Sequence, residues 1–149
     1  MIAERALRRG VGIAVAESLT AGNLAAALGA APDSGEWFVG GVVAYTKQAK
    51  RRVLRVPDVP VVSERAAEAM ARGVRELLAA DIAVAVTGVG GPGPQDGEPA
   101  GSVWFAAATS SGATTWHHLL TGDPPRILDD TVTCALEKLA ELVGAPLPP

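Results

Sequence analysis

The chain has 149 residues, of which 48% are hydrophobic and 19% are charged. This balance excludes a disordered polar chain and supplies enough apolar side chains for the core of a single domain, which we expect to span residues 1–149. The formal net charge is −3 at pH 7, so the chain lacks the excess of basic residues that is typical of general nucleic-acid binding.

A single cysteine, Cys134, excludes an internal disulfide framework and a zinc site built from cysteines. One free thiol is compatible with a reducing compartment. The sequence has no run of about 18 apolar residues, and its first residues lack the apolar segment of a signal peptide. We therefore expect a cytoplasmic protein that has neither a membrane nor a nucleic acid as a partner.

Helices and strands are predicted to alternate in the first part of the chain. The expected elements are a helix over 2–9, a strand over 11–16, a helix over 20–30, a strand over 37–45 and a helix over 47–54. Gly10 is suited to the left-handed conformation that ends a helix. Gly40 and Gly41 indicate a bulge or a close backbone approach within the second strand.

A long helix, a strand, a hairpin and a final helix are predicted for the rest of the chain. The expected elements are a helix capped by Ser63 that runs to Ala80, strands over 81–87, 102–109 and 114–120, and a helix from Asp123 to about Val143. The glycine-rich segment 88–101 is predicted to be a loop. This order favours an α/β fold, namely a three-layer α/β/α sandwich around a mixed, mostly parallel five-stranded sheet.

Three polar or glycine-rich segments, 16–20, 45–50 and 87–93, each follow a predicted strand. In open α/β sheets, the loops at the carboxyl ends of the strands form the usual ligand crevice. Ser18 lies in a strand-to-helix turn, where its hydroxyl is suited to act as a nucleophile beside backbone amides. The alternative is that Ser18 or Thr20 only caps the following helix.

A serine nucleophile needs a base, and the two histidines are poorly placed for that role. His117 and His118 are adjacent on a predicted strand and point to opposite faces, so they also make a poor metal site, and no metal is expected. A desolvated lysine is the remaining candidate base. Lys50 follows Tyr45 by five residues, which permits a Ser-Tyr-Lys relay. The alternative is that residues 47–52 form a solvated basic face, with Tyr45 at its rim.

Residues 88–93 read Gly-Val-Gly-Gly-Pro-Gly and formally match the G-x-G-x-x-G pattern. A dinucleotide-binding turn is not predicted, because prolines follow where that motif requires a helix, and a P-loop would need Gly-Lys-Ser/Thr. The glycines instead suit a nest of backbone amides that binds a phosphate or a carboxylate. The alternative is a flexible crossover that binds nothing.

Six short segments form a recognisable pattern. They are AESLTAG at 16–22, YTKQAK at 45–50, VSE at 62–64, TGVGGP at 87–92, PAGSVWF at 99–105 and GDP at 122–124. In this order they resemble the CinA C-terminal domain, the family of nicotinamide mononucleotide deamidases that is also called PncC. The resemblance covers about residues 5–143.

The resemblance implies hydrolysis of the carboxamide of nicotinamide mononucleotide to nicotinate mononucleotide and ammonia, without a metal or a cofactor. In that scheme, Ser18 attacks the amide carbon and Lys50 moves the protons together with Tyr45. Amides near Thr20 and Gly22 stabilise the oxyanion, and the glycine loop lies against the nucleotide. The substrate-binding residues are expected to be Glu17, Thr20, Gly22, Lys47, Gly88, Gly90 and Gly91.

Two positions differ in charge from the pattern of the family. The asparagine of the second segment is Lys47 here, and the arginine after Gly-Asp is Pro124, with Arg126 nearby. Arginines hold phosphates through charge-assisted hydrogen bonds. We hypothesise that Lys47 supplies the corresponding charge from the other side of the crevice.

Two alternative functions remain open at this point. One is a non-catalytic nucleotide-binding or assembly module of the same fold, and the other is an amidase for a different small amide. We also expect a homo-oligomer, because Trp37, Phe38 and Trp116 are interpreted as exposed apolar residues.

Overall fold

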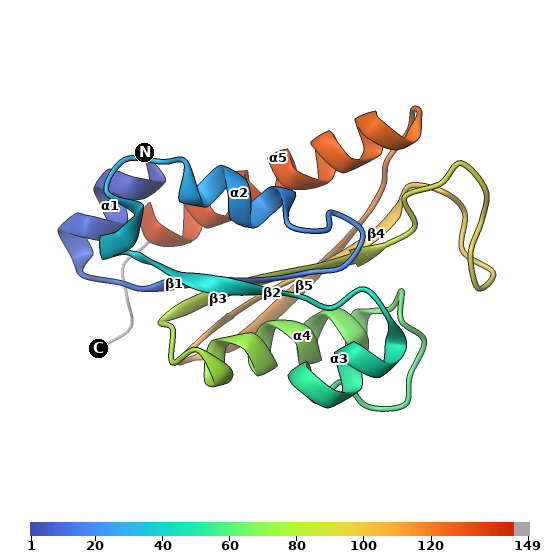
Figure 1. Ribbon diagram of the computed structural model, residues 1–149, viewed down its shortest axis with the longest axis horizontal. Coiled ribbons are helices and arrows are strands. Elements are labelled where there is room, and N and C mark those ends of the chain that lie inside the picture. The colour runs from blue at the N-terminus through green and yellow to red at the C-terminus, as the bar shows by residue number, and fades with distance from the viewer. Residues whose placement is uncertain (145–149) are drawn as a thin grey trace.

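The computed structural model describes residues 1–144 as five strands and six helical segments (Figure 1). The strands are β1 (Ile13–Glu17), β2 (Phe38–Val43), β3 (Ile82–Gly88), β4 (Ser102–Thr109) and β5 (Gly112–Leu119). The helices are α1 (Ile2–Arg9), α2 (Asn23–Gly29), α3 (Lys47–Leu54), α4 (Glu64–Leu77) and α5 (Pro124–Gly144), with a 3₁₀ turn η1 at Ser34–Glu36. The predicted elements are confirmed, and the differences lie at their ends.

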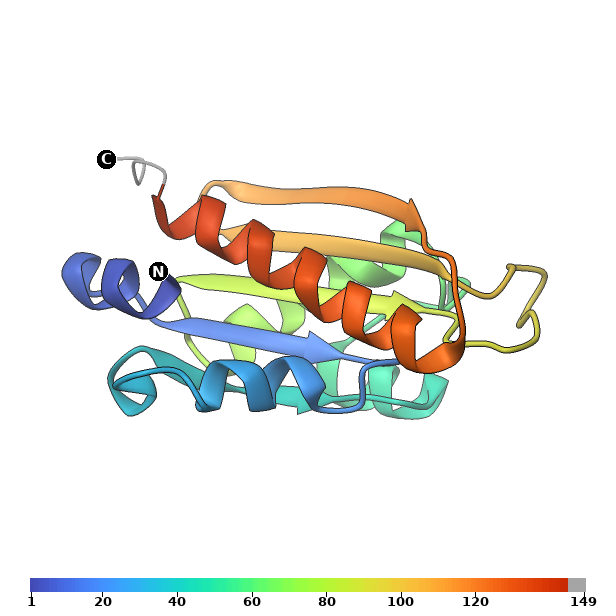
Figure 2. The same ribbon diagram turned by 90° about the horizontal axis from the view of Figure 1, so that it is seen from above.

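The five strands form one sheet in the order β2-β1-β3-β4-β5. Strand β1 pairs in parallel with β2 and with β3, whereas β4 is antiparallel to both β3 and β5. Only β4 therefore runs against the other strands, which confirms a mixed, mostly parallel sheet. Helices α1, α2 and α5 cover one face and α3 and α4 cover the other, so the molecule has three layers (Figures 1 and 2).

The two faces of the sheet are packed with side chains of different sizes. Along β1, Ile13 and Val15 belong to the core beneath α1, α2 and α5, while Ala14 and Ala16 belong to the core beneath α4. This division follows from the alternation of side chains along a strand. The small alanines leave room for α4 to lie close to the sheet. Helix α3 packs against α4 and is positioned by it.

Helices α3 and α4 pack so closely that the backbone of one lies against the backbone of the other. A Cβ atom added at Gly73 of α4 would lie only 2.3 Å from the carbonyl oxygen of Leu54, the last residue of α3. Only glycine permits this approach. The contact fixes the position of α3, whose first turn carries two lysines.

Several local predictions are confirmed. Gly10 adopts a left-handed conformation with φ of 63° after α1, and Ser63 caps α4 by accepting a hydrogen bond from the Ala66 amide at 3.2 Å. The register between β1 and β2 shifts next to Gly40, as expected for a bulge. Among residues 1–144, no helix has the length and apolar character needed to cross a membrane.

The interpretation of Trp37 as an exposed residue is wrong. Its side chain is 2% exposed within the core, and its indole N–H donates to the Pro32 carbonyl at 3.0 Å. Phe38 and Trp116 are half-buried and pack against the same core. The chain bends at η1 and turns the first aromatic residue inward, so these three side chains give no support to a homo-oligomer, which stays a prediction.

Candidate active site

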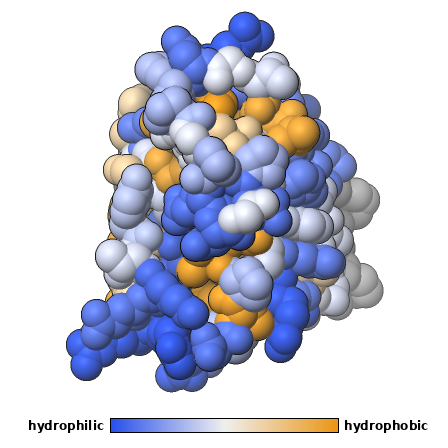
Figure 3. Space-filling view, turned by 90° about the vertical axis from the view of Figure 1, so that its right-hand side faces the viewer, coloured by the Kyte–Doolittle hydropathy of each residue, from blue (hydrophilic) through white to orange (hydrophobic). Residues whose placement is uncertain are grey.

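A cavity of about 730 Å³ opens at the carboxyl ends of β1, β2 and β3. Figure 3 views the molecule from this end, where apolar surface is visible between polar residues. The cavity wall combines the turn after β1, the first turn of α3, the glycine loop after β3 and the start of α5. The three segments that follow strands in the sequence therefore meet at one place.

Ser18 lies in the turn after β1 and forms part of the cavity wall. Its side chain is largely buried, and its carbonyl accepts a hydrogen bond from the Ala21 amide at 3.1 Å. Ala21 and Gly22 both have positive φ angles, 48° and 104°, which fold the turn tightly before α2. Ser18 does not cap α2, because its hydroxyl is bonded to a lysine of α3.

Glu17 caps the turn and the helix instead of Ser18. Its carboxylate, 1% exposed, accepts hydrogen bonds from the Thr20 hydroxyl at 2.6 Å and from the amides of Leu24 and Ala25 at 2.8 and 3.0 Å. A carboxylate at this position satisfies amides that a helix leaves free at its N-terminus. Glu17, Thr20 and Gly22 lie outside the cavity wall, so their predicted contact with the substrate stays a prediction.

Lys50 points from the first turn of α3 toward Ser18. The residue is 2% exposed, and its ammonium nitrogen Nζ donates to Ser18 Oγ at 2.9 Å and to the Tyr45 carbonyl at 3.1 Å. Burial lowers the pKa of Lys50 below the ordinary lysine value, because desolvation disfavours the charged form. The structure thus brings together the predicted nucleophile and the predicted base.

The Tyr45 side chain lies at the rim of the cavity and is largely exposed. Tyr45 contacts Lys50 through its backbone carbonyl, which accepts a hydrogen bond from Lys50 Nζ. Within residues 1–144, its phenolic hydroxyl makes no hydrogen bond to Ser18 or to Lys50. A proton relay through this hydroxyl therefore stays a prediction.

Lys47 occupies the cavity rim at the start of α3. Its Nζ forms an ion pair with the Asp58 carboxylate at 3.0 Å, and both side chains are more than half exposed. Lys47 and then Arg51 hold the pKa of Asp58 below its usual value. Sequence reasoning missed Asp58, because it lies on a loop beyond α3 and no local pattern links it to Lys47.

Gly88, Gly90 and Gly91 all form part of the cavity wall. Gly91 has a φ of 81°, which a residue with a side chain rarely adopts. In the described part of the chain, the amide N–H groups of Gly90 and Gly91 have no hydrogen-bond acceptor. They are thus available to a ligand, although whether they bind one stays a prediction.

The base of the glycine loop is firmly closed. The Val89 amide donates to the Ser102 carbonyl at 3.0 Å, the Gly101 amide to Val89 at 2.8 Å and the Leu120 amide to Gly101 at 2.8 Å. A Cβ atom at Gly101 would lie 1.9 Å from the Leu120 carbonyl oxygen. The two ends of the loop are therefore held together by backbone contacts that leave no space for a side chain.

Thr87 is a cavity residue that sequence reasoning did not place among the site residues. Its hydroxyl is buried and donates to the Val61 carbonyl at 2.6 Å, which fixes the loop between α3 and α4 against the end of β3. The available signal was a polar residue at the end of an otherwise apolar strand.

Neither histidine contributes to the cavity wall. His117 Nε2 lies 2.9 Å from Ser102 Oγ, and that hydroxyl also donates to the Glu98 carboxylate at 3.0 Å. Residues 1–144 contain no cluster of three or more side chains suited to bind a metal ion.

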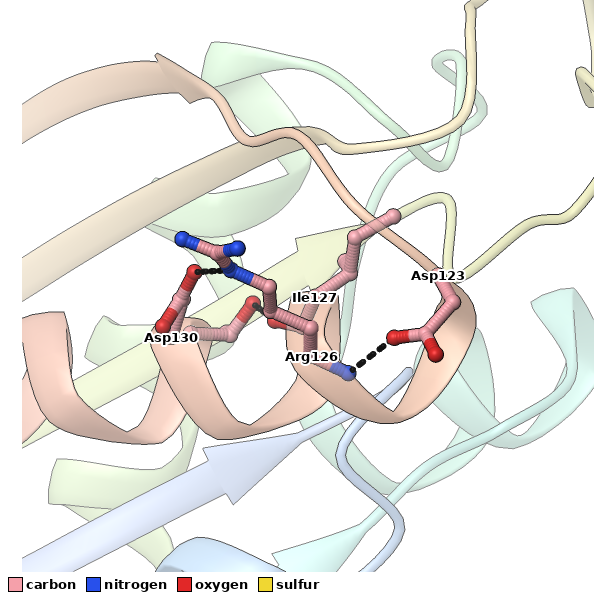
Figure 4. A network of polar contacts seen from close by, with 5 residues as sticks. Asp123, Arg126, Ile127 and Asp130 are labelled. Carbon is pink, nitrogen blue, oxygen red and sulfur yellow. Dashed lines mark hydrogen bonds and ion pairs between the residues drawn. The ribbon is translucent and has the colours of Figure 1, made fainter.

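The start of α5 covers the cavity with apolar side chains. Pro124 and Leu128 form part of the wall, whereas Arg126 does not. As Figure 4 shows, the Arg126 amide donates to the Asp123 carboxylate at 3.2 Å, and the Arg126 guanidinium is turned toward Asp130 at 3.6 Å. Asp123 thus caps α5 as predicted.

This fold and this site define a three-layer α/β protein with a buried serine–lysine pair in a cavity at the strand ends. A family model described as the CinA C-terminal domain matches residues 1–143. The chain belongs to this family, which confirms the resemblance found in the sequence.

Curated relatives extend the comparison. Protein YdeJ of Escherichia coli is 38% identical over 95% of this chain and 86% of its own length. The nicotinamide-nucleotide amidohydrolase PncC of Pseudomonas putida is 38% identical over 87% of this chain and 85% of its own length. Other relatives are longer: the CinA-like protein of Frankia casuarinae is 39% identical over 93% of this chain, which spans about a third of that protein.

Solved structures share the fold. The competence damage-inducible protein A of Klebsiella pneumoniae superimposes with a TM-score of 0.93 at 38% identity, over 98% of this chain and 94% of that one. A competence/damage inducible protein of Agrobacterium tumefaciens gives a TM-score of 0.82 at 34% identity, over 95% and 94% of the two chains. The predicted fold class is thereby confirmed.

Proposed function

We propose that the protein hydrolyses the carboxamide of nicotinamide mononucleotide to nicotinate mononucleotide and ammonia. The observation that carries this proposal is the 2.9 Å contact between Ser18 Oγ and the buried Lys50 Nζ, at the wall of a cavity. The relative named nicotinamide-nucleotide amidohydrolase supports the choice of substrate.

The first step is the activation of Ser18. A lysine whose pKa is lowered by burial is more readily neutral, and a neutral amine has a lone pair that accepts a proton. As the Ser18 oxygen bonds to the carboxamide carbon, its proton passes to the lone pair of neutral Lys50 Nζ, which lies 2.9 Å from Ser18 Oγ. The Tyr45 carbonyl orients the amine by accepting one of its hydrogens.

The carboxamide oxygen gains negative charge in this step, and amide N–H groups near the nucleophile stabilise it. We assign this role first to the amide of Leu19, because Leu19 directly follows Ser18 and forms part of the cavity wall. Its N–H is without an acceptor in the part of the chain that the structure describes. Gly90 and Gly91, which belong to the glycine loop, line the same cavity.

The intermediate then breaks its carbon–nitrogen bond. The leaving nitrogen takes the proton from the Lys50 ammonium and departs as ammonia, which leaves an ester between Ser18 and the nicotinoyl group. Lys50, neutral again, accepts a proton from water as the water oxygen attacks the ester carbon. Return of that proton to the Ser18 oxygen releases the carboxylic acid, which ionises to nicotinate mononucleotide.

The test is the release of ammonia from nicotinamide mononucleotide by the purified protein, by the Ser18→Ala variant and by the Ser110→Ala variant. Ser110 lies on the β4–β5 turn, at the opposite end of the sheet, and is the matched control. We expect release by the parent protein and the control, and a loss of at least about a thousandfold in Ser18→Ala. Full activity in Ser18→Ala would refute the mechanism, and inactivity of the folded parent protein would refute the function.

A further inference from the structure

The charged residues of the cavity wall are few. In the described part of the chain they are Lys47, Lys50 and Asp96. Lys50 is buried against Ser18 and the Tyr45 carbonyl, so it is not free to hold a second charged group. Lys47 is consequently the cation through which this wall can attract an anionic part of a ligand.

Among residues 1–144, the α5 side of the cavity wall supplies no competing cation. The start of α5 presents Pro124 and Leu128 to the cavity, and the Arg126 guanidinium is directed along the helix to Asp130 (Figure 4). A phosphate in the cavity would therefore meet apolar side chains at α5 and an ammonium group at α3.

We propose that Lys47 determines the preference of this site for phosphorylated amides, and that Asp58 occupies Lys47 until the substrate phosphate replaces it. This inference rests on the proposed function for the identity of the ligand. It makes Lys47 a specificity-determining residue and Asp58 its internal competitor.

The exchange is favoured by the geometry of the pair. Lys47 and Asp58 are joined by one contact of 3.0 Å between exposed side chains, and such surface pairs contribute little to stability. A phosphate monoester carries more negative charge than a carboxylate and offers three acceptor oxygens. Arg51 also acts on Asp58 electrostatically, so the carboxylate keeps a cationic neighbour when Lys47 leaves it.

Direct binding separates this proposal from the catalytic one. In a Ser18→Ala background, where turnover does not interfere, the dissociation constants of nicotinamide mononucleotide and of nicotinamide riboside are measured by calorimetry. The two ligands differ only in the phosphate. The variants are Lys47→Gln, Asp58→Asn and, as a control, Glu68→Gln, which removes the exposed Glu68–Arg72 pair on α4.

We expect Lys47→Gln to weaken binding of the mononucleotide by roughly tenfold or more, the usual effect of losing a charged hydrogen bond, and to leave riboside binding unchanged. Asp58→Asn should strengthen mononucleotide binding by roughly two- to fivefold, because an exposed competitor is removed. Glu68→Gln should change neither constant. A loss of folding would weaken binding in both variants. It therefore cannot explain weaker binding by Lys47→Gln together with stronger binding by Asp58→Asn.

Equal binding of the two ligands by the Ser18→Ala protein would overturn the proposal, as would a Lys47→Gln effect of equal size on both. Ammonia release by the parent protein combined with an unchanged preference in Lys47→Gln would refute this inference alone. If the parent protein releases no ammonia but the variants show the expected binding pattern, the role of Lys47 in phosphate preference would be supported and the proposed function would be refuted.

Discussion

Two lysines one turn apart on α3 have opposite surroundings. Lys50 is 2% exposed and bonded to a serine hydroxyl and a carbonyl, whereas the Lys47 side chain is 54% exposed and paired with a carboxylate. Both contribute to the wall of the same cavity. Both residues are lysines on one helix, so residue type does not distinguish them. Their different burial does: the buried amine is suited to proton transfer, and the exposed one is suited to hold a charge.

The depth of Lys50 is set by the packing of α3. The close approach of Gly73 to Leu54 holds α3 against α4, and the alanine-rich face of the sheet holds α4 in turn. Thr46 begins α3 by accepting a hydrogen bond from the Ala49 amide at 3.1 Å. Lys47 lies at this beginning and faces solvent, and Lys50 lies one turn further in.

The largest expected difference between the two lysines is catalytic. Lys50→Met should lower kcat for ammonia release by at least about a thousandfold, because the proposed proton transfer loses its base. Lys47→Met should leave kcat nearly unchanged and raise KM. Steady-state kinetics on nicotinamide mononucleotide measure both effects. An equal loss of kcat in the two variants would contradict the different roles expected for Lys50 and Lys47.

The pH dependence sharpens the same distinction. The proposed mechanism needs neutral Lys50, so kcat/KM should rise by up to about tenfold per pH unit until the pH reaches the pKa of this lysine in the free protein. Burial lowers that pKa below the ordinary value of 10.5, so the plateau should begin below pH 10.5. Lys50→Arg, which stays charged, should be inactive throughout. A rate that is independent of pH would exclude Lys50 as the base.

The contact between Gly73 and Leu54 holds α3 in place. Gly73→Ala places a methyl group 2.3 Å from the Leu54 carbonyl oxygen, so it should destabilise the fold by about 1–3 kcal/mol and displace Lys50. Gly29→Ala, at a helical glycine whose added Cβ meets nothing within 4 Å, is the matched control and should be neutral or slightly stabilising. Urea unfolding with the ammonia assay would show whether the two variants differ.

The smallest effect concerns stability alone. The unfolded chain binds a proton at Lys50 more readily than the folded one, so stability should rise with pH between the lowered pKa and 10.5. Lys50→Met removes this cost and should raise the free energy of unfolding at pH 7 by about 1 kcal/mol, because methionine has no charge to desolvate. Lys47→Met should stay within about 0.5 kcal/mol of the parent protein. Thermal unfolding that shows no gain for Lys50→Met would argue against a desolvated charge.

Most of the fold was predictable because its signals are local. The bounds of α3, the cap at Ser63 and the bulge at Gly40 follow from residue types within a few positions. The start of α2 was not predictable to the residue, because Glu17 caps it from the preceding strand across the turn. The burial of Trp37 likewise depends on how the chain bends at η1.

The site was predictable where neighbours along the chain determine it. Consecutive residues at a strand end point to opposite faces, so Glu17 is directed to α2 and Ser18 to α3. The motif residues indicated both, but only the tertiary structure assigns the first to a helix cap and the second to Lys50. Asp58 pairs with Lys47 of α3, and Thr87 bonds to Val61 of the loop between α3 and α4, and no sequence spacing encodes those contacts.

The closed base of the glycine loop has a consequence for changes in the length of that loop. Backbone contacts among Val89, Gly101 and Leu120 hold the ends of the loop, while the Ser18–Lys50 contact belongs to other elements. The segment between these ends is therefore a place where sequences of different length can be grafted without disturbing the sheet. A change in the length of this segment would therefore reshape one wall of the cavity and leave the Ser18–Lys50 contact in place.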